Sequence, residues 1–152
     1  MINMTDFEYS VSADRKGAVV REYTAALDEL DNVTGFIEEE LEKLDCPFKV
    51  STQVAVAVEE IFVNIAHYAY GGETGRMMLC FVPGDDGYVD IVFVDRGIPF
   101  DPLKREDPDI TLSAEEKPIG GLGIYMVKKS MDEVIYSYEN GQNILTLRKK
   151  IH

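Results

Sequence analysis

Apolar residues in the first half of the chain recur at the spacing of two helices. Residues 28–47 predict an amphipathic helix that opens with acidic side chains and ends at Pro47. A linker over Pro47–Ser51 follows. The apolar run beyond it predicts a second, more buried helix that reaches Tyr70, with Ser51 or Thr52 as its cap and two glycines after its end. The apolar positions of the first helix are Leu30, Val33, Phe36, Ile37, Leu41 and Leu44.

The second half of the chain is dominated by β-type patterns. Residues 75–95 form two apolar runs around Pro-Gly-Asp-Asp-Gly, and residues 133–150 alternate on both sides of Asn140-Gly141, so each segment predicts a hairpin. Between them, residues 96–118 carry four prolines and predict a long binding loop or lid, and residues 120–134 predict a glycine-led helix. Near the N-terminus, residues 6–17 suggest a short strand, and residues 18–27 fit either a strand or a helix.

This order of elements predicts an α/β (α+β) two-layer sandwich. We expect a mixed, mostly antiparallel sheet that is covered on one face by helices. A chain of 152 residues with 45% hydrophobic content fits one domain over residues 1–152, with residues 1–17 as an N-terminal extension or an extra strand.

Composition narrows the function classes. The net charge of −13 repels nucleic acid and anionic membranes, so neither is an expected partner. Cys46 and Cys80 stand far apart and form no zinc-type cluster, which favours a reducing cytoplasm over a disulfide scaffold. No apolar run has the length of a membrane span and the first residues show no signal pattern, so a cytoplasmic protein is expected.

Glu60 and Asn64 interrupt the apolar second helix one turn apart, and His67 and Tyr68 continue the same polar stripe. Asparagine is a poor residue for a helix interior because its side chain competes for backbone groups. One interpretation is a satisfied buried hydrogen bond or a solvent-facing edge. The other is a carboxylate and an amide oxygen that hold a hard cation and a neighbouring water or hydroxyl.

Two further polar sites interrupt the β-rich half. Asp95 ends a strand and Gly97 follows, a pattern that is either a simple turn or an acceptor placed at a pocket rim to read an exocyclic amine. Gly120, Gly121 and Gly123 precede a helix, where exposed N–H groups favour a phosphate but a flexible hinge is equally consistent. The segment is neither a Walker A loop nor a Rossmann fingerprint.

Taken in order, "EEIFVN", "DRGIPFDP" and "GGLGIYMVKK" resemble the N, G1 and G2 boxes of the GHKL (Bergerat-fold) ATPases. The chain is most similar to the stand-alone anti-sigma-factor serine kinases of the RsbW-like, histidine-kinase-like branch. The resemblance covers roughly residues 30–150. Three boxes in the expected order, on a helix, a strand end and a loop-to-helix junction, are a specific signal.

The resemblance implies ATP and Mg²⁺ as cofactors and assigns roles to single residues. Asn64 would be the magnesium ligand and Glu60 the general base that takes a proton from a serine hydroxyl. Asp95 would accept from the adenine amino group and Gly97 would give the ring room. Tyr68 stands where relatives place another nucleotide-contacting side chain, usually histidine. The phosphate-binding segment would be Gly120, Gly121, Leu122 and Gly123, with Lys117 the nearest match to a basic lid residue.

The resemblance implies an ATP-dependent serine/threonine protein kinase and anti-sigma factor of a bacterial partner-switching system. Its substrate would be an anti-sigma-factor antagonist with a STAS-like domain, and it would also hold a sigma factor and form a homodimer. A non-catalytic, ATP-dependent module that sequesters a regulatory partner is the alternative. A detached histidine-kinase catalytic domain is disfavoured, because the chain's histidines are only His67 and His152.

Overall fold

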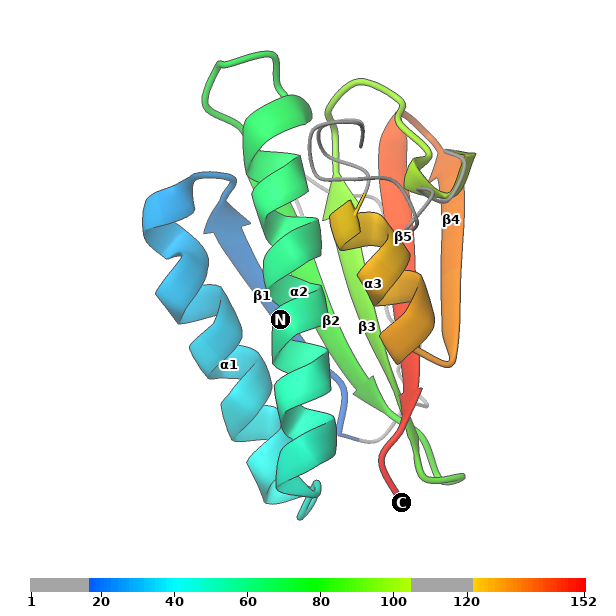
Figure 1. Cartoon of the computed structure of the whole chain (residues 1–152). Coiled ribbons are helices and arrows are strands. Elements are labelled where there is room, and N and C mark those ends of the chain that lie inside the picture. Colours follow the sequence, from blue (N-terminus) through cyan, green and yellow to red (C-terminus); the bar gives the residue numbers. More distant parts are fainter. Residues whose placement is uncertain (1–16, 105–121) are drawn as a thin grey trace.

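The computed structural model describes residues 17–104 and 122–152, which form a five-stranded sheet with helices on one face (Figure 1). The strand order is β1-β2-β3-β5-β4, and every pairing among these strands is antiparallel. The predicted α/β sandwich is confirmed, and the described sheet is wholly antiparallel rather than mixed. The strands are β1 (Val19–Thr24), β2 (Arg76–Pro83), β3 (Tyr88–Asp95), β4 (Glu133–Glu139) and β5 (Gln142–Lys150).

In the described part of the chain, three α-helices cover the sheet and two 3-10 turns accompany them. The α-helices are α1 (Leu30–Lys43), α2 (Phe48–Tyr68) and α3 (Leu122–Ser130), and the 3-10 turns are η1 (Leu27–Glu29) and η2 (Pro102–Lys104). α1 and α2 run antiparallel and α3 packs beside α2 (Figure 1). None of the helices in the described ranges combines the length and apolar character that a bilayer span requires.

Both predicted hairpins are present. Asn140 and Gly141 both have positive φ angles, 54° and 74°, which is the two-residue turn that Asn-Gly favours. The β4–β5 hairpin sets the register of β5, which then pairs with β3 so that Asn143 lies opposite Asp95. This register places two polar side chains together at one edge of an apolar sheet.

The strands alternate between two apolar clusters. Met77, Leu79 and Phe81 point toward the helices and join the main core, whereas Met78, Cys80 and Val82 belong to a second buried cluster on the opposite face. Residues of β2 are therefore buried on both sides, which explains the continuous apolar run in the sequence. Burial raises the pKa of the Cys80 thiol to about 12, so this cysteine stays protonated and inert.

The predicted linker between the first two helices was wrong. α2 begins at Phe48, directly after Pro47, because proline has no N–H to lose at a helix start. Ser51 and Thr52 lie inside the helix instead of capping it, and the Thr52 hydroxyl donates to the carbonyl of Phe48 at 3.0 Å. The helix ends at Tyr68, two residues earlier than predicted, and left-handed glycines follow.

The predictions for the N-terminal segments and for the loop after β3 can be compared with the structure only in part. The ambiguous segment 18–27 contains β1, which pairs with β2. The described part of the predicted loop after β3 contains the short 3-10 turn η2, where the Leu103 N–H donates to Asp101 Oδ1 at 2.8 Å. Residues 6–16 of the predicted N-terminal strand, and the loop beyond residue 104, lie outside the described residues.

Candidate functional site

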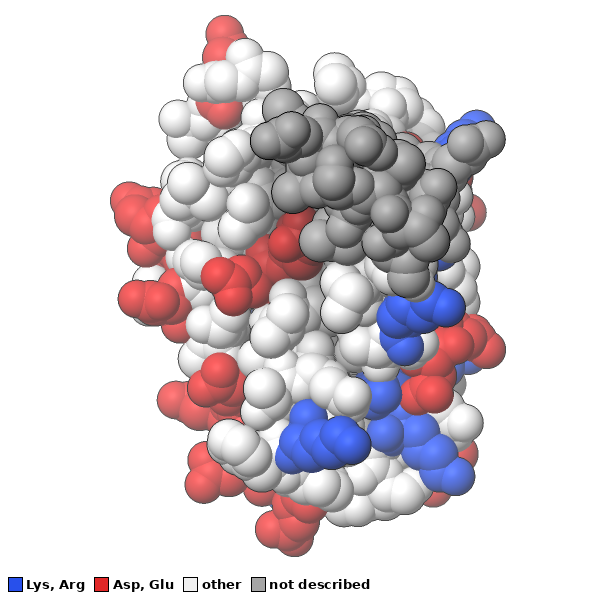
Figure 2. Space-filling model, viewed as in Figure 1, with Lys and Arg blue, Asp and Glu red and all other residues white. Residues whose placement is uncertain are grey.

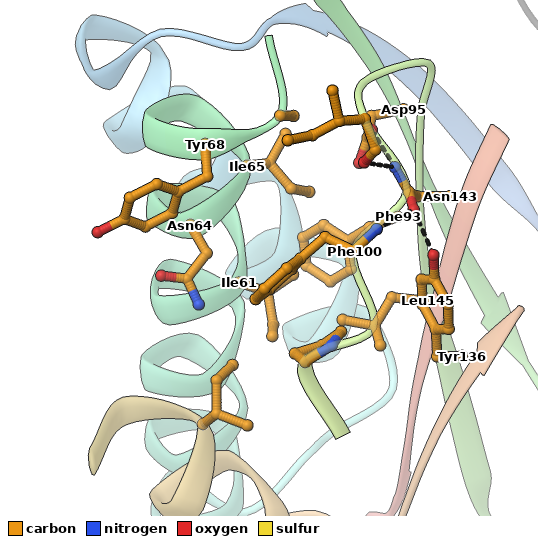
Figure 3. Close-up of a pocket in the computed structure, with 14 residues that line it drawn as sticks. Ile61, Asn64, Ile65, Tyr68, Phe93, Asp95, Phe100, Tyr136, Asn143 and Leu145 are labelled. Atoms are coloured by element: carbon orange, nitrogen blue, oxygen red, sulfur yellow. Dashed lines mark hydrogen bonds between the residues drawn. The ribbon is translucent and has the colours of Figure 1, made fainter. Parts of the chain in front are cut away.

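A mostly apolar pocket opens between α2, the end of β3, the start of β5, the neighbouring strand β4 and the start of α3 (Figure 3). Its empty space, counted together with its open mouth, is about 570 Å³. Its polar groups are few, so each can orient a ligand. The lining residues are Ile61, Asn64, Ile65, Tyr68, Ala69, Phe93, Asp95, Ile98, Phe100, Pro102, Ile124, Tyr136, Asn143 and Leu145.

Asp95 is the only acidic residue among these lining residues, and it is 5% exposed. Its Oδ1 accepts the N–H of Gly97 at 2.8 Å and the side-chain amide of Asn143 at 2.9 Å. No described residue donates to Oδ2, so one carboxylate oxygen keeps its capacity to accept from a ligand. Burial raises the pKa of Asp95 above its ordinary value, and the two hydrogen bonds oppose that rise.

Asn143 on β5 organises this wall of the pocket. Its amide nitrogen donates to Asp95 and to the carbonyl of Ile98 at 2.9 Å, and its Oδ1 accepts from the N–H of Phe100 at 3.1 Å and from the Tyr136 hydroxyl. Figure 3 shows the Asp95, Asn143 and Tyr136 side chains joined in one chain of contacts. Sequence reasoning missed both Asn143 and Tyr136. The local signal in the sequence was a polar residue at the start of an apolar strand, and the structure shows that Asn143 is 6% exposed.

The loop after β3 is fastened to the end of α2. Ile98 N–H donates to the carbonyl of Ala69 at 2.9 Å, and the Arg96 N–H donates to the Tyr70 hydroxyl at 2.9 Å. A Cβ added at Gly97 would lie 2.1 Å from the same Ala69 oxygen, so the loop can approach the helix only with glycine there. This packing accounts for Gly97 structurally, and its predicted contact with an adenine ring stays a prediction.

Half of the polar stripe on α2 reaches the pocket. Asn64 and Tyr68 line the pocket across from Asp95, and Tyr68 is 58% exposed (Figure 3). No hydrogen bond joins the side chain of Asn64 or Glu60 to another residue within the described ranges. Glu60 and Asn64 are half-buried, which fits a partly solvated edge of the helix, and their predicted roles stay predictions. His67 does not line the pocket.

Glu60 lies beside the start of α3 rather than inside the pocket. A Cβ added at Gly123 would come within 1.9 Å of Glu60 Oε1, so the absence of a side chain at position 123 lets the carboxylate lie against the helix start. Leu122 is the first residue of α3. Gly120, Gly121 and Lys117, predicted to contact phosphates or close the lid, lie outside the described residues.

The described residues offer few protein ligands for a metal at this site. Among residues 17–104 and 122–152, no three His, Cys, Asp or Glu side chains gather as a metal-binding group. Asn64 supplies one oxygen at the mouth of the pocket. Magnesium characteristically keeps few protein ligands and completes its octahedron with phosphate oxygens and water, so this donor set fits an ion brought in with a nucleotide.

Comparisons with known proteins relate this chain to kinase-like ATPase domains. The family described as "Histidine kinase-like ATPase domain" matches residues 23–149. The serine-protein kinase RsbW of Bacillus thuringiensis subsp. konkukian (strain 97-27) is 31% identical over 94 residues, which span 59% of this chain and 58% of that protein. RsbW of Bacillus cereus (strain AH187) is 27% identical over 118 residues, spanning 75% of this chain and 67% of that protein.

Solved structures support the fold. The structure of the RsbU and RsbW domains of Rv1364c from Mycobacterium tuberculosis superposes with a TM-score of 0.64 at 15% identity, over 88% of this chain and 32% of that one. The SiaB-SiaC complex from Pseudomonas aeruginosa gives a TM-score of 0.57 at 14% identity, over 86% and 88% of the two chains. At these identities the likeness shows the fold alone.

Proposed function

The chain belongs to the family of histidine kinase-like ATPase domains, and from this premise we propose that it is an ATP-dependent protein serine/threonine kinase and anti-sigma factor. Its substrate would be a serine on an anti-sigma-factor antagonist with a STAS-like domain, and a sigma factor would be its second partner. The RsbW relatives are named serine-protein kinases, and the aligned segment spans 58% of the Bacillus thuringiensis protein, so activity and partners are proposed for this chain.

One observation carries the proposal: Asp95 presents a single open carboxylate oxygen inside an apolar pocket. Such a group accepts from an exocyclic amine, and adenine has one beside a flat apolar ring system. Ile61, Ile65 and Phe93 offer the apolar contacts that such a ring needs. Glu60 and Asn64 stand along α2 toward the pocket mouth, where a triphosphate would extend from the base.

The family resemblance assigns the following roles. Bound Mg-ATP would supply the phosphoryl group and the metal charge that offsets its oxygens. Asn64 would ligate the metal with its side-chain oxygen and Glu60 would hold the proton released by the attacking serine hydroxyl. Gly121 and Gly123 would contact the phosphates, with Gly120 and Leu122 beside them, and Tyr68 would contact the nucleotide. Phosphoryl transfer needs little more from a protein than positioning, charge neutralisation and a base.

The test pairs nucleotide titration with a phosphotransfer assay. Calorimetry with ATP and Mg²⁺ should register binding, and labelled phosphate should move to a serine of the antagonist domain encoded beside this gene. Glu60→Gln should lower the transfer rate about 10²- to 10⁴-fold while ATP affinity stays within about twofold. Glu39→Gln is the matched control, since it makes the same change at an exposed glutamate on α1, outside the pocket.

The outcomes of these assays distinguish a kinase from a non-catalytic binding module. Binding without transfer by the wild type would identify the non-catalytic sequestering module instead of a kinase. Full transfer by Glu60→Gln would remove Glu60 from the base role, and no heat with ATP would reject the nucleotide site altogether. A cytoplasmic location and a homodimer stay predictions, and light scattering would test the second.

A further inference from the structure

A second concave surface lies on the outer side of the α1–α2 pair, away from the pocket. We call it the α1–α2 groove. α1 contributes residues spaced four apart, and α2 contributes a stripe from Phe48 to Glu59, so both walls follow helix faces. None of its members lines the nucleotide pocket. The lining residues are Thr34, Glu38, Glu42, Cys46, Phe48, Ser51, Thr52, Ala55, Val56 and Glu59.

The groove exposes large apolar side chains on a very acidic protein. Phe48 is 86% exposed and Val56 is 58% exposed, and both project from the same stripe of α2. Neither contributes to the core cluster under these helices. An exposed phenylalanine at a helix start has no role in the fold shown here, and apolar residues grouped in a concave surface are typical of interaction sites.

The rim of the groove carries one sign of charge. Glu38 and Glu42 border it on α1 and Glu59 borders it on α2, and none of its ten lining residues is Lys or Arg. Lys49 follows Phe48 in the chain but does not line the groove. Figure 2 shows Asp and Glu gathered over α1 and the middle of α2, with Lys and Arg concentrated lower on the molecule, mainly beside and below α3.

We propose that the α1–α2 groove docks a basic amphipathic helix of a partner protein. The stripe from Phe48 to Glu59 spans eleven residue steps, about 16 Å or three helical turns, which matches a short helical segment lying lengthwise. Aliphatic side chains of that segment contact Phe48 and Val56, and its Lys or Arg side chains pair with the three rim glutamates. Helix-in-groove recognition uses this division between apolar anchors and flanking charges.

The groove and the nucleotide pocket share α2. Glu59 ends the groove and Glu60 belongs to the pocket side of the same helix turn. A partner held in the groove is thereby tethered next to the proposed base, which raises the local concentration of any serine that the partner carries. Docking itself requires no nucleotide, so it can be tested apart from the kinase activity.

The first experiment isolates the apolar contacts. The probe is a labelled 18-residue peptide of leucine and lysine arranged with helical periodicity, titrated in 150 mM salt without nucleotide and followed by fluorescence anisotropy. The double variant Phe48→Ser/Val56→Ser leaves every charge in place and should weaken binding at least tenfold. Ile135→Ser removes an apolar side chain that is 45% exposed on β4 and should change nothing. Melting temperatures verify that each variant is folded.

The second experiment isolates the charges. Replacing the three rim glutamates by glutamine should weaken binding and flatten its salt dependence, whereas the same number of neutralisations at Asp85, Asp86 and Glu139 should leave both unchanged. A peptide with glutamate in place of lysine should not bind.

Three results would overturn the proposal. Equal losses from the rim and the distant neutralisations would show attraction to net charge alone, and unchanged binding by the double serine variant would show that the groove makes no apolar contact. Light scattering that finds a dimer in the wild type and a monomer in Phe48→Ser would assign the groove to a second copy of this chain. Nucleotide calorimetry on the same variants should match the wild type, so failure of docking would leave the nucleotide site untouched.

Discussion

Asp95→Asn gives the sharpest test of how the pocket reads a base. Oδ1 of Asp95 accepts two hydrogen bonds, from the Gly97 N–H and the Asn143 amide. An asparagine in this place would keep its oxygen toward the same two donors, which forces its NH₂ group into the position of Oδ2. The substitution therefore converts the open acceptor into a donor while conserving shape.

The magnitude follows from the lost hydrogen bond. A hydrogen bond to a charged group contributes about 1.5–3 kcal/mol, so ATP affinity should fall roughly 10- to 150-fold at 25 °C. Inosine triphosphate carries a carbonyl in place of the adenine amine, so the new NH₂ should donate to it. The variant should bind inosine triphosphate more tightly than the wild type does, which a simple loss of structure would not produce.

Acidification should mimic the substitution. Because burial raises the pKa of Asp95, protonation of the wild type begins at a higher pH than for an ordinary aspartate. The raised pKa also makes the buried charge a cost to folding that appears as pH rises through the folded pKa. Asp95→Asn has no such cost, so its unfolding free energy relative to the wild type should increase from pH 4 to pH 7.

The assay is competition calorimetry with both nucleotides at pH 5 and pH 7, with urea unfolding of each protein alongside. The reasoning is refuted if Asp95→Asn binds ATP as the wild type does. It is also refuted if a fully folded variant loses both nucleotides equally, because the base would then be recognised by something other than this carboxylate.

Three further substitutions test the neighbouring groups. Asn64→Ala should abolish the increase in nucleotide affinity that Mg²⁺ produces, measured by titration with and without EDTA, and an unaltered magnesium dependence would count against its role as a ligand. Asn143→Ala should lower the free energy of unfolding, measured in urea, by about 1–3 kcal/mol and should weaken ATP binding. The reason is that Asp95, the Ile98 carbonyl and the Phe100 N–H lose the side chain that joins them. A drop in stability with normal ATP affinity would limit Asn143 to a structural role. Gly123→Ala should displace the Glu60 carboxylate and slow phosphotransfer, whereas Gly35→Ala, with nothing within 4 Å of the added carbon, should leave transfer unchanged and stabilise α1 by about 1 kcal/mol. Equal transfer rates in the two glycine variants would contradict the contact between Glu60 and position 123.

Local patterns were informative wherever a structure depends on residues close together in the chain. Helical spacing located α1, and Asn140-Gly141 located a hairpin, because periodicity and turn chemistry act over a few residues. The start of α2 was predicted in the wrong place, because the local pattern there allows more than one structure. Pro47 is compatible with both a linker and a helix start, and only the packing of the helix against the sheet selects between them.

The sequence by itself determined the order of elements, the family resemblance and the polar residues Asn64 and Asp95 that line the pocket. Only the tertiary structure decided that Asn143, which stands 48 positions from Asp95, would lie across from it and leave one carboxylate oxygen open. The physical reason is that strand register is set by turns and by burial of whole sheet faces, so a contact between distant residues has no signature in local spacing. The exposure of Phe48 in the α1–α2 groove is likewise a property of how two helices pack.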